Sequence, residues 1–283
     1  MLFFVGFSVV LLSVAGGYLW HGGVLGVLWQ PSEILIILGA AFGAFLIANS
    51  MHLVKECGKQ LPRAIFGSNK DSAMYLDLLG LLYDIFNKAR REGMIAVEAD
   101  IESPADSGIF TRYPRLLKDA RIIEFITDNL RILTTSNLAP HEIEAMMESE
   151  IETLMHEMIE PSHAIHRVAD GLPGFGIVAA VLGIVITMQK LGGPPDVLGQ
   201  SVAAALIGTF LGIFFAYGFV GPMSSRLASV ADEEIKMFQC VKAAIVATSN
   251  GLPPQMAVEF ARKTLFSADR PSFSQLENHV RSR

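Results

Sequence analysis

Four long apolar segments stand out from the polar remainder of the chain. They cover residues 2–20, 34–51, 174–189 and 197–223, and none of them contains Asp, Glu, Lys, Arg or His. A helix needs roughly 20 residues to cross the ~30 Å hydrocarbon core of a bilayer, so each segment with its apolar flanks is long enough to span it. The pattern predicts an all-α, polytopic membrane protein with four transmembrane helices.

The polar part between the second and third apolar segments has helical periodicity. Leucines and aromatic residues recur every three or four positions beside charged ones, which is typical of amphipathic helices. The expected helices are residues 71–92, 118–133 and 139–160, and we expect the third of these to end at Pro161. After the fourth span, we expect the helix to continue past Pro222 to a break at 250–254, followed by two short helices.

The distribution of basic residues predicts the orientation. Of the 22 Lys and Arg residues, 13 fall between Lys55 and Arg167, 8 fall from Arg226 onward, and only Lys190 lies between the last two spans. Basic residues favour the cytoplasmic side, so both termini are expected in the cytoplasm of a bacterial inner-membrane protein. The predicted organisation is listed by range: 1–51, transmembrane helices 1 and 2; 52–168, a large cytoplasmic helical domain; 169–226, transmembrane helices 3 and 4; 227–283, a cytoplasmic helical tail.

Composition excludes several classes of function. The net charge is −6 and no basic cluster is present, which argues against a nucleic-acid partner. No phosphate-binding glycine loop or nucleophile elbow appears, and the histidines at 156, 163 and 166 do not form a HExxH zinc motif, so no enzyme activity, metal or cofactor is expected. Cys57 and Cys240 are expected to be free thiols in a reducing compartment.

Small residues recur at helical spacing in the spans. In lipid, small residues allow helix backbones to approach closely. The stripe in the fourth span is Ala204, Gly208, Gly212 and Ala216, and the stripe in the third is Gly176, Ala179 or Ala180, and Gly183. Packing within one chain explains these stripes, but a second use, lining a pathway or receiving a helix of another subunit, stays open.

An ionisable side chain is missing from the third and fourth spans. Proton-moving membrane proteins usually place such a group at membrane depth, and these spans offer only the hydroxyls of Thr187, Thr209 and Tyr217. Glu33 is expected at the outer rim and Asp170 at the inner one. If the chain conducts protons, the carboxylate is therefore expected to come from a partner helix.

Two prolines lie near the inner ends of these spans. Pro173 is expected to begin the third span, and Pro222 is expected to kink the fourth and free a backbone carbonyl. Together with nearby glycines, they are interpreted as a deformable joint that couples the spans to the cytoplasmic domain. Pro173 alone could be a simple helix start.

Four motifs resemble those of a known family. The segments "REGMIAVEADIE", "DGLPGFGIVAAVLGIVITM", "GTFLGIFFAYGFVGP" and "VEFARKTLFSADRPSFSQLE" are similar to those of the MotA stator subunits of the flagellar motor, within the MotA/TolQ/ExbB proton-channel family. The resemblance covers essentially the whole chain. It implies a stator subunit that forms a proton channel with MotB, requires no cofactor, transports H+ and couples proton flow to torque on the rotor.

The resemblance also implies roles for individual residues. Pro173 and Pro222 match prolines tied to coupling, Thr209 matches a threonine that faces the ion pathway, and Ala180 matches the alanine of proton-type members. Arg90 and Glu98 match a charged pair that engages the rotor protein FliG; on the residues alone a solvated charged face explains them better, and only the resemblance gives them this role.

The family also implies partners, and other readings remain. Its members form a pentamer, embedded in membrane lipid, around a MotB dimer whose membrane aspartate accepts the proton.

One alternative function is that of a TolQ/ExbB-like channel subunit that energises envelope processes. The other is a non-conducting membrane scaffold, which would show the same spans and small-residue stripes.

Overall fold

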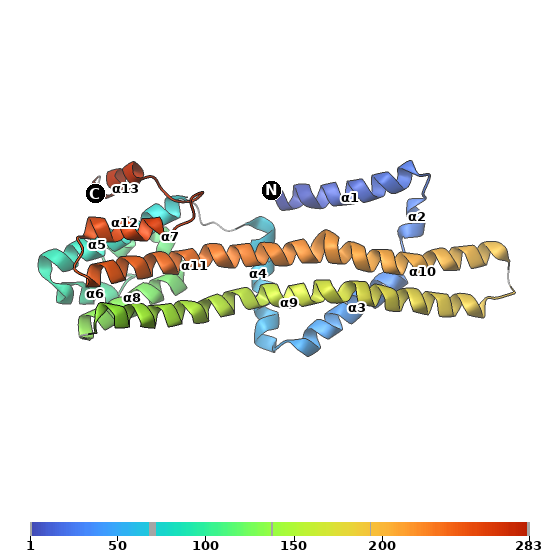
Figure 1. Cartoon of the computed structure of the whole chain (residues 1–283), viewed down its shortest axis with the longest axis horizontal. Coiled ribbons are helices and arrows are strands. Elements are labelled where there is room, and N and C mark those ends of the chain that lie inside the picture. The colour runs from blue at the N-terminus through green and yellow to red at the C-terminus, as the bar shows by residue number, and fades with distance from the viewer. Residues whose placement is uncertain (1, 68–71, 137, 193, 282–283) are drawn as a thin grey trace. The chain divides into compact units, whose positions relative to one another are not determined.

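The computed structural model describes residues 2–67, 72–136, 138–192 and 194–281, and every regular element in these ranges is helical (Figure 1). The all-α class predicted from the sequence is confirmed. The α-helices are α1 (Leu2–Trp20), α2 (Leu25–Leu28), α3 (Pro31–Ala48), α4 (Met51–Phe66), α5 (Ser72–Glu92), α6 (Glu98–Glu102), α7 (Pro114–Leu117), α8 (Ala120–Thr135), α9 (Pro140–Gln189), α10 (Pro195–Phe215), α11 (Gly221–Ser249), α12 (Pro254–Lys263) and α13 (Phe273–Arg281). Short 3-10 turns cover Met94–Val97 and Phe110–Arg112, and a π-helical turn covers Ala216–Val220.

The chain divides into two compact units. The first, which we call the membrane unit, comprises Met1–Ser68 and Met158–Val230, and the second, the polar unit, comprises Asn69–Glu157 and Ala231–Arg283. The divisions fall within the helices α9 and α11 as well as in the segment after α4. Each unit has its own buried core and is described separately.

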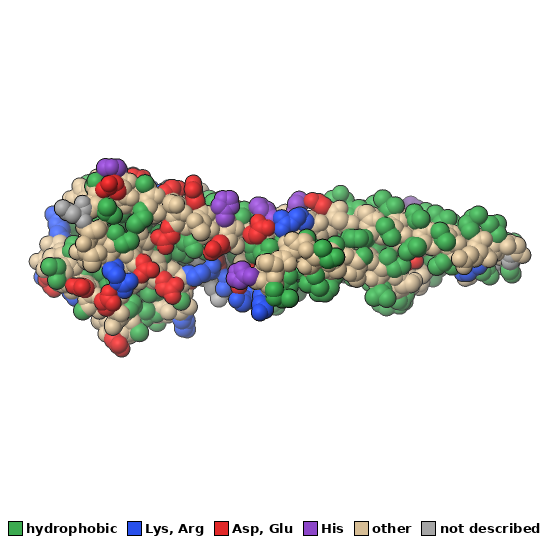
Figure 2. Space-filling view, turned by 90° about the horizontal axis from the view of Figure 1, so that it is seen from below, with side chains coloured by type: hydrophobic (Ala, Val, Ile, Leu, Met, Phe, Trp, Pro, Cys, Tyr) green, Lys and Arg blue, Asp and Glu red, His purple; other side chains and the backbone are tan. Residues whose placement is uncertain are grey.

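The membrane unit contains the apolar segments. Four helical stretches of the described chain are long and apolar enough to cross a membrane, Leu2–Trp20, Leu25–Ala48, Pro140–Gln189 and Val197–Ser249, as predicted. At the end of the molecule that carries α9 and α10 in Figure 1, Figure 2 shows many hydrophobic side chains and few charged ones. Exposing so much apolar surface to water is unfavourable, so this surface suits contact with lipid or with other subunits.

Packing in the membrane unit centres on one face of α3 and the facing sides of α9 and α10. Ile37 and Ala41 of α3 are buried together with Leu172, Ala179, Ile207 and Leu211. By contrast, α1 buries none of its residues. The helix α4, which the sequence analysis did not anticipate, packs Cys57 and Ala64 against Ala164 and Leu227.

The prolines of α9 correct two expectations. Pro161 was expected to end a helix and Pro173 to begin one, but both lie inside the continuous helix Pro140–Gln189. A proline in a helix interior removes one backbone hydrogen bond and costs about 3 kcal/mol. Burial of Ala164, Ile165 and Leu172 around the two prolines offsets that cost, so tertiary packing overrides the local signal.

The polar unit packs the leucine-rich face of α5 into its core. Leu78, Leu82 and Ile85 are fully buried there, and α12 and α13 cover this helix (Figure 1). Phe125 of α8 meets Phe238 of α11 edge to face, with ring centroids 5.1 Å apart. The predicted helices at 71–92 and 118–133 are confirmed as α5 and α8.

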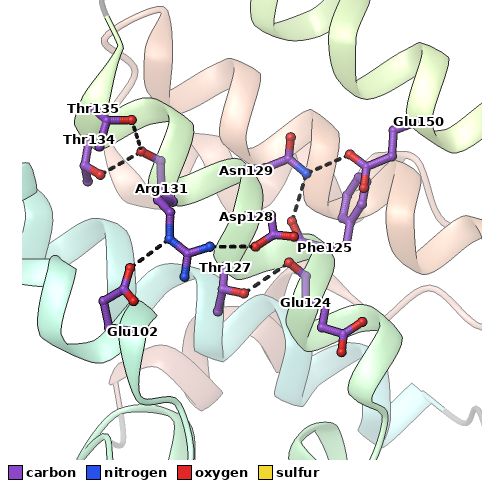
Figure 3. A network of polar contacts seen from close by, with 10 residues as sticks. All are labelled: Glu102, Glu124, Phe125, Thr127, Asp128, Asn129, Arg131, Thr134, Thr135 and Glu150. Atoms are coloured by element: carbon purple, nitrogen blue, oxygen red, sulfur yellow. Dashed lines mark hydrogen bonds and ion pairs between the residues drawn. The ribbon is translucent and has the colours of Figure 1, made fainter.

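Polar contacts connect α6, α8 and α9 in the polar unit (Figure 3). Arg131 of α8 donates from Nε to Glu102 of α6 at 2.8 Å and from Nη1 to Asp128 at 2.9 Å. The buried amide of Asn129 donates to the Phe125 carbonyl at 2.9 Å and to Glu150 of α9 at 3.1 Å. These bonds set the positions of the short helix α6 and of the first turns of α9 against α8.

Candidate functional site

The glycines of α9 and α10 bring the two backbones into direct contact. A Cβ added to Gly176 would lie 2.9 Å from the Gly208 carbonyl oxygen and 3.0 Å from the Gly212 Cα. A Cβ on Gly212 would lie 2.7 Å from the Leu172 carbonyl oxygen. These separations are shorter than a carbon side chain tolerates, so glycine is required at this contact.

The contact continues toward the turn between α9 and α10. A Cβ added to Gly183 would lie 2.9 Å from the Ala205 Cβ. In the predicted stripe, Gly208, Gly212 and Ala216 are buried, whereas Ala204 is half-buried beside the fully buried Ala205. The small residues are thus used for packing between α9 and α10 of this chain. A pathway or a helix of another subunit would have to use the exposed faces of these helices instead.

The hydroxyls of the spans have different surroundings. Thr187 is buried, and its Oγ1 donates to the Gly183 carbonyl at 2.8 Å within its own helix. Thr209 is half-buried and directly follows Gly208 in α10, whereas Tyr217 is 71% exposed. Ala180 is buried, and its backbone nitrogen would lie 3.0 Å from a Cβ on Gly208. Ala180 and Thr209 therefore lie at the same level of the α9–α10 pair.

Glu33, expected at the outer rim of its span, is buried against α10. It is only 6% exposed, on the buried face of α3 that also carries Ile37 and Ala41. Its Oε2 would lie 3.1 Å from a Cβ on Gly208, which is thirteen residues after Pro195 at the start of α10. At 1.5 Å per residue, this level lies about 20 Å from Pro195 along α10.

Pro222 follows a helix irregularity. The π-helical turn Ala216–Val220 interrupts the helix directly before it, which agrees with the expected disturbance of the fourth span. Because Pro222 has no N–H, it cannot bond to the carbonyl four residues earlier, and π-turns are a known cause of helix bends. Pro222 is exposed and Pro173 is half-buried.

Tyr217 and Pro222 face a cavity in the membrane unit. Its volume is about 550 Å³, and it lies between α1, the end of α4 and the π-helical turn. The lining is largely apolar and aromatic, with Phe3, Phe7 and Phe219 among its residues and Arg226 as its charged member. The π-helical turn therefore borders open volume, and α1 also contacts it there, with the ring centroids of Phe7 and Phe219 4.8 Å apart.

Two serines join α9 and α11 close to this turn. Ser162 Oγ donates to the Ser224 carbonyl at 2.8 Å, and Ser224 Oγ donates to the Ser162 carbonyl at 3.2 Å. Both residues are buried. This reciprocal pair ties α9, one residue after Pro161, to α11, two residues after Pro222.

Arg90 and Glu98 are both exposed in the polar unit. Arg90 lies in the last turn of α5 and Glu98 begins α6. Between them, Gly93 has a φ of +90°, a conformation that favours glycine, and its N–H closes the end of α5 on the Ala89 carbonyl at 3.0 Å.

An ion pair between the half-buried Lys88 and the buried Asp100 joins the two helices that carry this charged pair. Lys88 Nζ of α5 lies 2.7 Å from Asp100 Oδ2 of α6, and Ser107 Oγ donates to Asp100 Oδ1 at 2.6 Å. Lys88 is two residues before Arg90, and Asp100 is two residues after Glu98. The ion pair therefore holds Arg90 and Glu98 on one fixed surface.

Among the described residues, no group of three or more His, Cys, Asp or Glu is arranged to hold a metal ion. His163 and His166 are exposed and lie 3.8 Å from Glu160 and 3.7 Å from Asp170. These are ordinary surface contacts at helical spacing.

Two features that the structure makes prominent were not predicted from the sequence: the burial of Glu33 and the pairing of Lys88 with Asp100 across two helices. The burial of Glu33 has a sequence signal, because Glu33 is the lone acidic residue on the helical face that carries Ile37 and Ala41. The Lys88–Asp100 pair joins two helices across a turn, and no local spacing rule predicts it.

Similarity to known proteins extends over the whole chain. Residues 4–93 match the family described as motility protein A N-terminal, and residues 118–240 match the MotA/TolQ/ExbB proton channel family. Motility protein A of Salmonella typhimurium is 46% identical over 282 residues, covering 100% of this chain and 96% of the relative.

Two solved structures have a similar fold. The structure of C. jejuni MotAB matches with a TM-score of 0.78 at 21% identity, covering 95% of this chain and 98% of that one. The flagellar MotAB stator complex from Bacillus subtilis matches with a TM-score of 0.74 at 22% identity, covering 94% and 97%. At 21% and 22% identity, these matches show a shared fold and nothing further.

Proposed function

The chain belongs to the MotA/TolQ/ExbB proton channel family, and we propose that it is a stator subunit of the bacterial flagellar motor that couples proton flow to torque. The observation that carries the proposal is similarity along the full length to a protein named for motility. Because residues 4–93 match a segment specific to motility protein A, this favours the motor over a TolQ/ExbB-like role in the envelope.

We propose that the ion pathway runs along α9 and α10 beside a partner helix. The α9–α10 contact uses one side of α9, and the rest of its apolar surface is open: Ile177, Val181, Ile184 and Met188 are each 50 to 60% exposed. Such surfaces suit lipid, further copies of the chain and a MotB-type partner helix. The partner would supply the carboxylate that accepts the proton, and Ala180 and Thr209 would border its path.

The assembly is proposed to be a pentamer of this chain around a MotB dimer, as family resemblance implies. The helix α1 buries none of its residues within the chain, which supports its use against lipid or neighbouring subunits. With basic residues concentrated outside the two short hairpins, both termini would be cytoplasmic.

Torque transfer is proposed to involve Arg90 and Glu98. Their exposure leaves both side chains available to a charged surface of the rotor protein FliG. Proton-driven repacking near the partner carboxylate would change the bend at Pro173 and at the π-helical turn before Pro222. The continuous helices α9 and α11 would carry that change to the polar unit.

The test is complementation of cells that lack their own stator. The chain and its MotB-type partner are expected to restore swimming and to acidify the cytoplasm, and neutralising the partner's carboxylate should abolish both. Swimming should persist without sodium and stop when the proton gradient is collapsed. Envelope energisation without rotation would instead support the TolQ/ExbB alternative, and absence of flux with normal assembly would support a scaffold.

A further inference from the structure

Glu33 is a buried carboxyl group whose Oε2 has no hydrogen-bond partner in the described part of the chain. The residue is 6% exposed and lies on the α3 face formed with Ile37 and Ala41. Its Oε2 is directed at the backbone of α10, 3.1 Å from where a Cβ on Gly208 would lie. Glycine at position 208 therefore leaves the space that this carboxyl group occupies.

Helix capping does not explain this placement. Glu33 is the third residue of α3, where a carboxylate often bonds to the free N–H groups of the first turn. Its Oε2 makes no such bond and faces the neighbouring helix instead. The side chain thus loses hydration without gaining the usual partners of that position.

In the described elements packed around Glu33, the charged residues lie far from it along each helix. The short helix α2 has no ionisable residue, and neither does the rest of α3. Along α9 and the turn that follows it, the nearest charged residues to Ala180 are Asp170 and Lys190, each ten positions away. In α10, the nearest charged residue to Gly208 is Asp196, twelve positions away. These spacings correspond to about 15 Å or more along a helix.

We propose that Glu33 is a second proton-binding group of the complex, located in this chain at the level of Ala180 and Gly208. This inference rests on the proposed proton-conducting function and deepens it. An ionised carboxylate without partners at membrane depth is costly, whereas the neutral acid is tolerated. Protonation of the Glu33 carboxyl group therefore favours packing of α3 onto α10, and loss of the proton disfavours it.

The transfer step is a simple protonation. A hydronium ion gives its proton to a carboxylate oxygen of Glu33, which forms the O–H bond and leaves water, and the reverse transfer to water restores the carboxylate. No electrons are exchanged. The ionised form gains solvation by leaving the Gly208 contact, so release of the proton loosens α3 from α10 and changes the wall of the pathway next to Thr209.

Chemical labelling of the wild-type chain tests the site directly. Dicyclohexylcarbodiimide reacts with protonated carboxyl groups in apolar surroundings, and mass spectrometry of the membrane-embedded complex with its partner should show an adduct on Glu33 that decreases as the pH rises. Glu33→Gln should lose the adduct, whereas Asp170→Asn, at a carboxyl group 66% exposed, should keep it. A chain unlabelled at Glu33 when folded but labelled there after denaturation would overturn the proposal.

Rotation speed as a function of external pH tests whether protonation of Glu33 takes part in motor function. Glu33→Gln retains the shape of the side chain but cannot titrate, and should remove one titration step from the curve. Glu33→Asp should retain that step at a shifted pH. Wild-type curves in both variants, at equal amounts of membrane-assembled chain, would overturn the inference. A labelled Glu33 in a wild-type complex that passes no protons would instead refute the proposed function and leave the proton-binding site standing.

Discussion

Gly176 and Gly212 meet backbone to backbone, and a Cβ added to Gly212 would lie 2.8 Å from the Gly176 Cα. At this point α9 and α10 have no side chain between them. Close approach of this kind replaces the hydrophobic force that lipid cannot supply between helices. The residues around the candidate pathway are positioned by this contact.

Gly212→Ala is expected to destabilise the membrane unit. The added methyl group collides with the Leu172 carbonyl and the Gly176 backbone, and overpacking of this kind costs about 1–3 kcal/mol. Thermal unfolding of the detergent-solubilised chain measures the loss. Gly199→Ala in the same helix is the control, since nothing lies within 4 Å of its added Cβ. Equal melting temperatures for the two variants would contradict the close contact.

Pro173→Ala is expected to abolish rotation without preventing membrane assembly. Alanine restores the N–H that proline lacks, so the helix regains a bond to the Ala169 carbonyl and becomes stiffer at the proposed joint. Rotation of tethered cells and the amount of membrane-bound complex are the measurements. Pro161→Ala makes the same chemical change in the same helix, next to the Ser162–Ser224 pair, and should rotate. Normal motility of the Pro173 variant would refute the hypothesis that Pro173 forms a deformable joint needed for rotation.

Arg90→Glu and Glu98→Lys are expected to lower swimming speed strongly while leaving the unfolding midpoint unchanged. Both side chains are exposed, and surface charges contribute little to stability, so a loss of torque reports on recognition. Arg91→Glu is the matched control, because Arg91 is also exposed and lies in the same helical turn. Undiminished speed after reversal at both positions would remove the assignment to the rotor contact.

Asp100→Asn is expected to lower both the stability of the polar unit and the torque. It removes the charge that pairs with Lys88, a change worth about 2 kcal/mol for a charged hydrogen bond. Chemical denaturation of the full chain measures the first effect and tethered-cell rotation the second. Asp128→Asn, on an exposed carboxylate paired with Arg131, should change neither. If Asp100→Asn lost stability but kept full torque, the pair would serve the fold alone.

Cys240 is expected to resist maleimide labelling in the folded chain. Complete burial raises the pKa of this thiol to about 12 from the ordinary value of 9.0, so almost no thiolate forms at pH 8. Because the folded pKa is above the unfolded one, the thiol's contribution to stability is complete below pH 9 and declines as the pH rises from 9 toward 12. Labelling should begin only with denaturant-induced unfolding, and rapid labelling of the native chain would contradict the burial.

The sequence by itself determined the four spans and the long amphipathic helices. Spans follow from length and apolarity measured against a bilayer, and α5 and α8 follow from the 3.6-residue period of their leucines and isoleucines. Both signals are local, so they need no knowledge of neighbouring elements. The helix α4 has the same kind of local signal in residues 51–66, although this segment was not among the predicted helices.

Only the tertiary structure decided how the prolines and carboxyl groups are used. Pro161 and Pro173 remain helical because packing of Ala164 and Leu172 offsets their missing hydrogen bonds. Glu33 is buried because α3 begins level with the middle of α10, and the relative depth of two helices depends on side chains that lie far apart in the chain. Local periodicity contains no information about such offsets, which arise from the sum of contacts between whole helices.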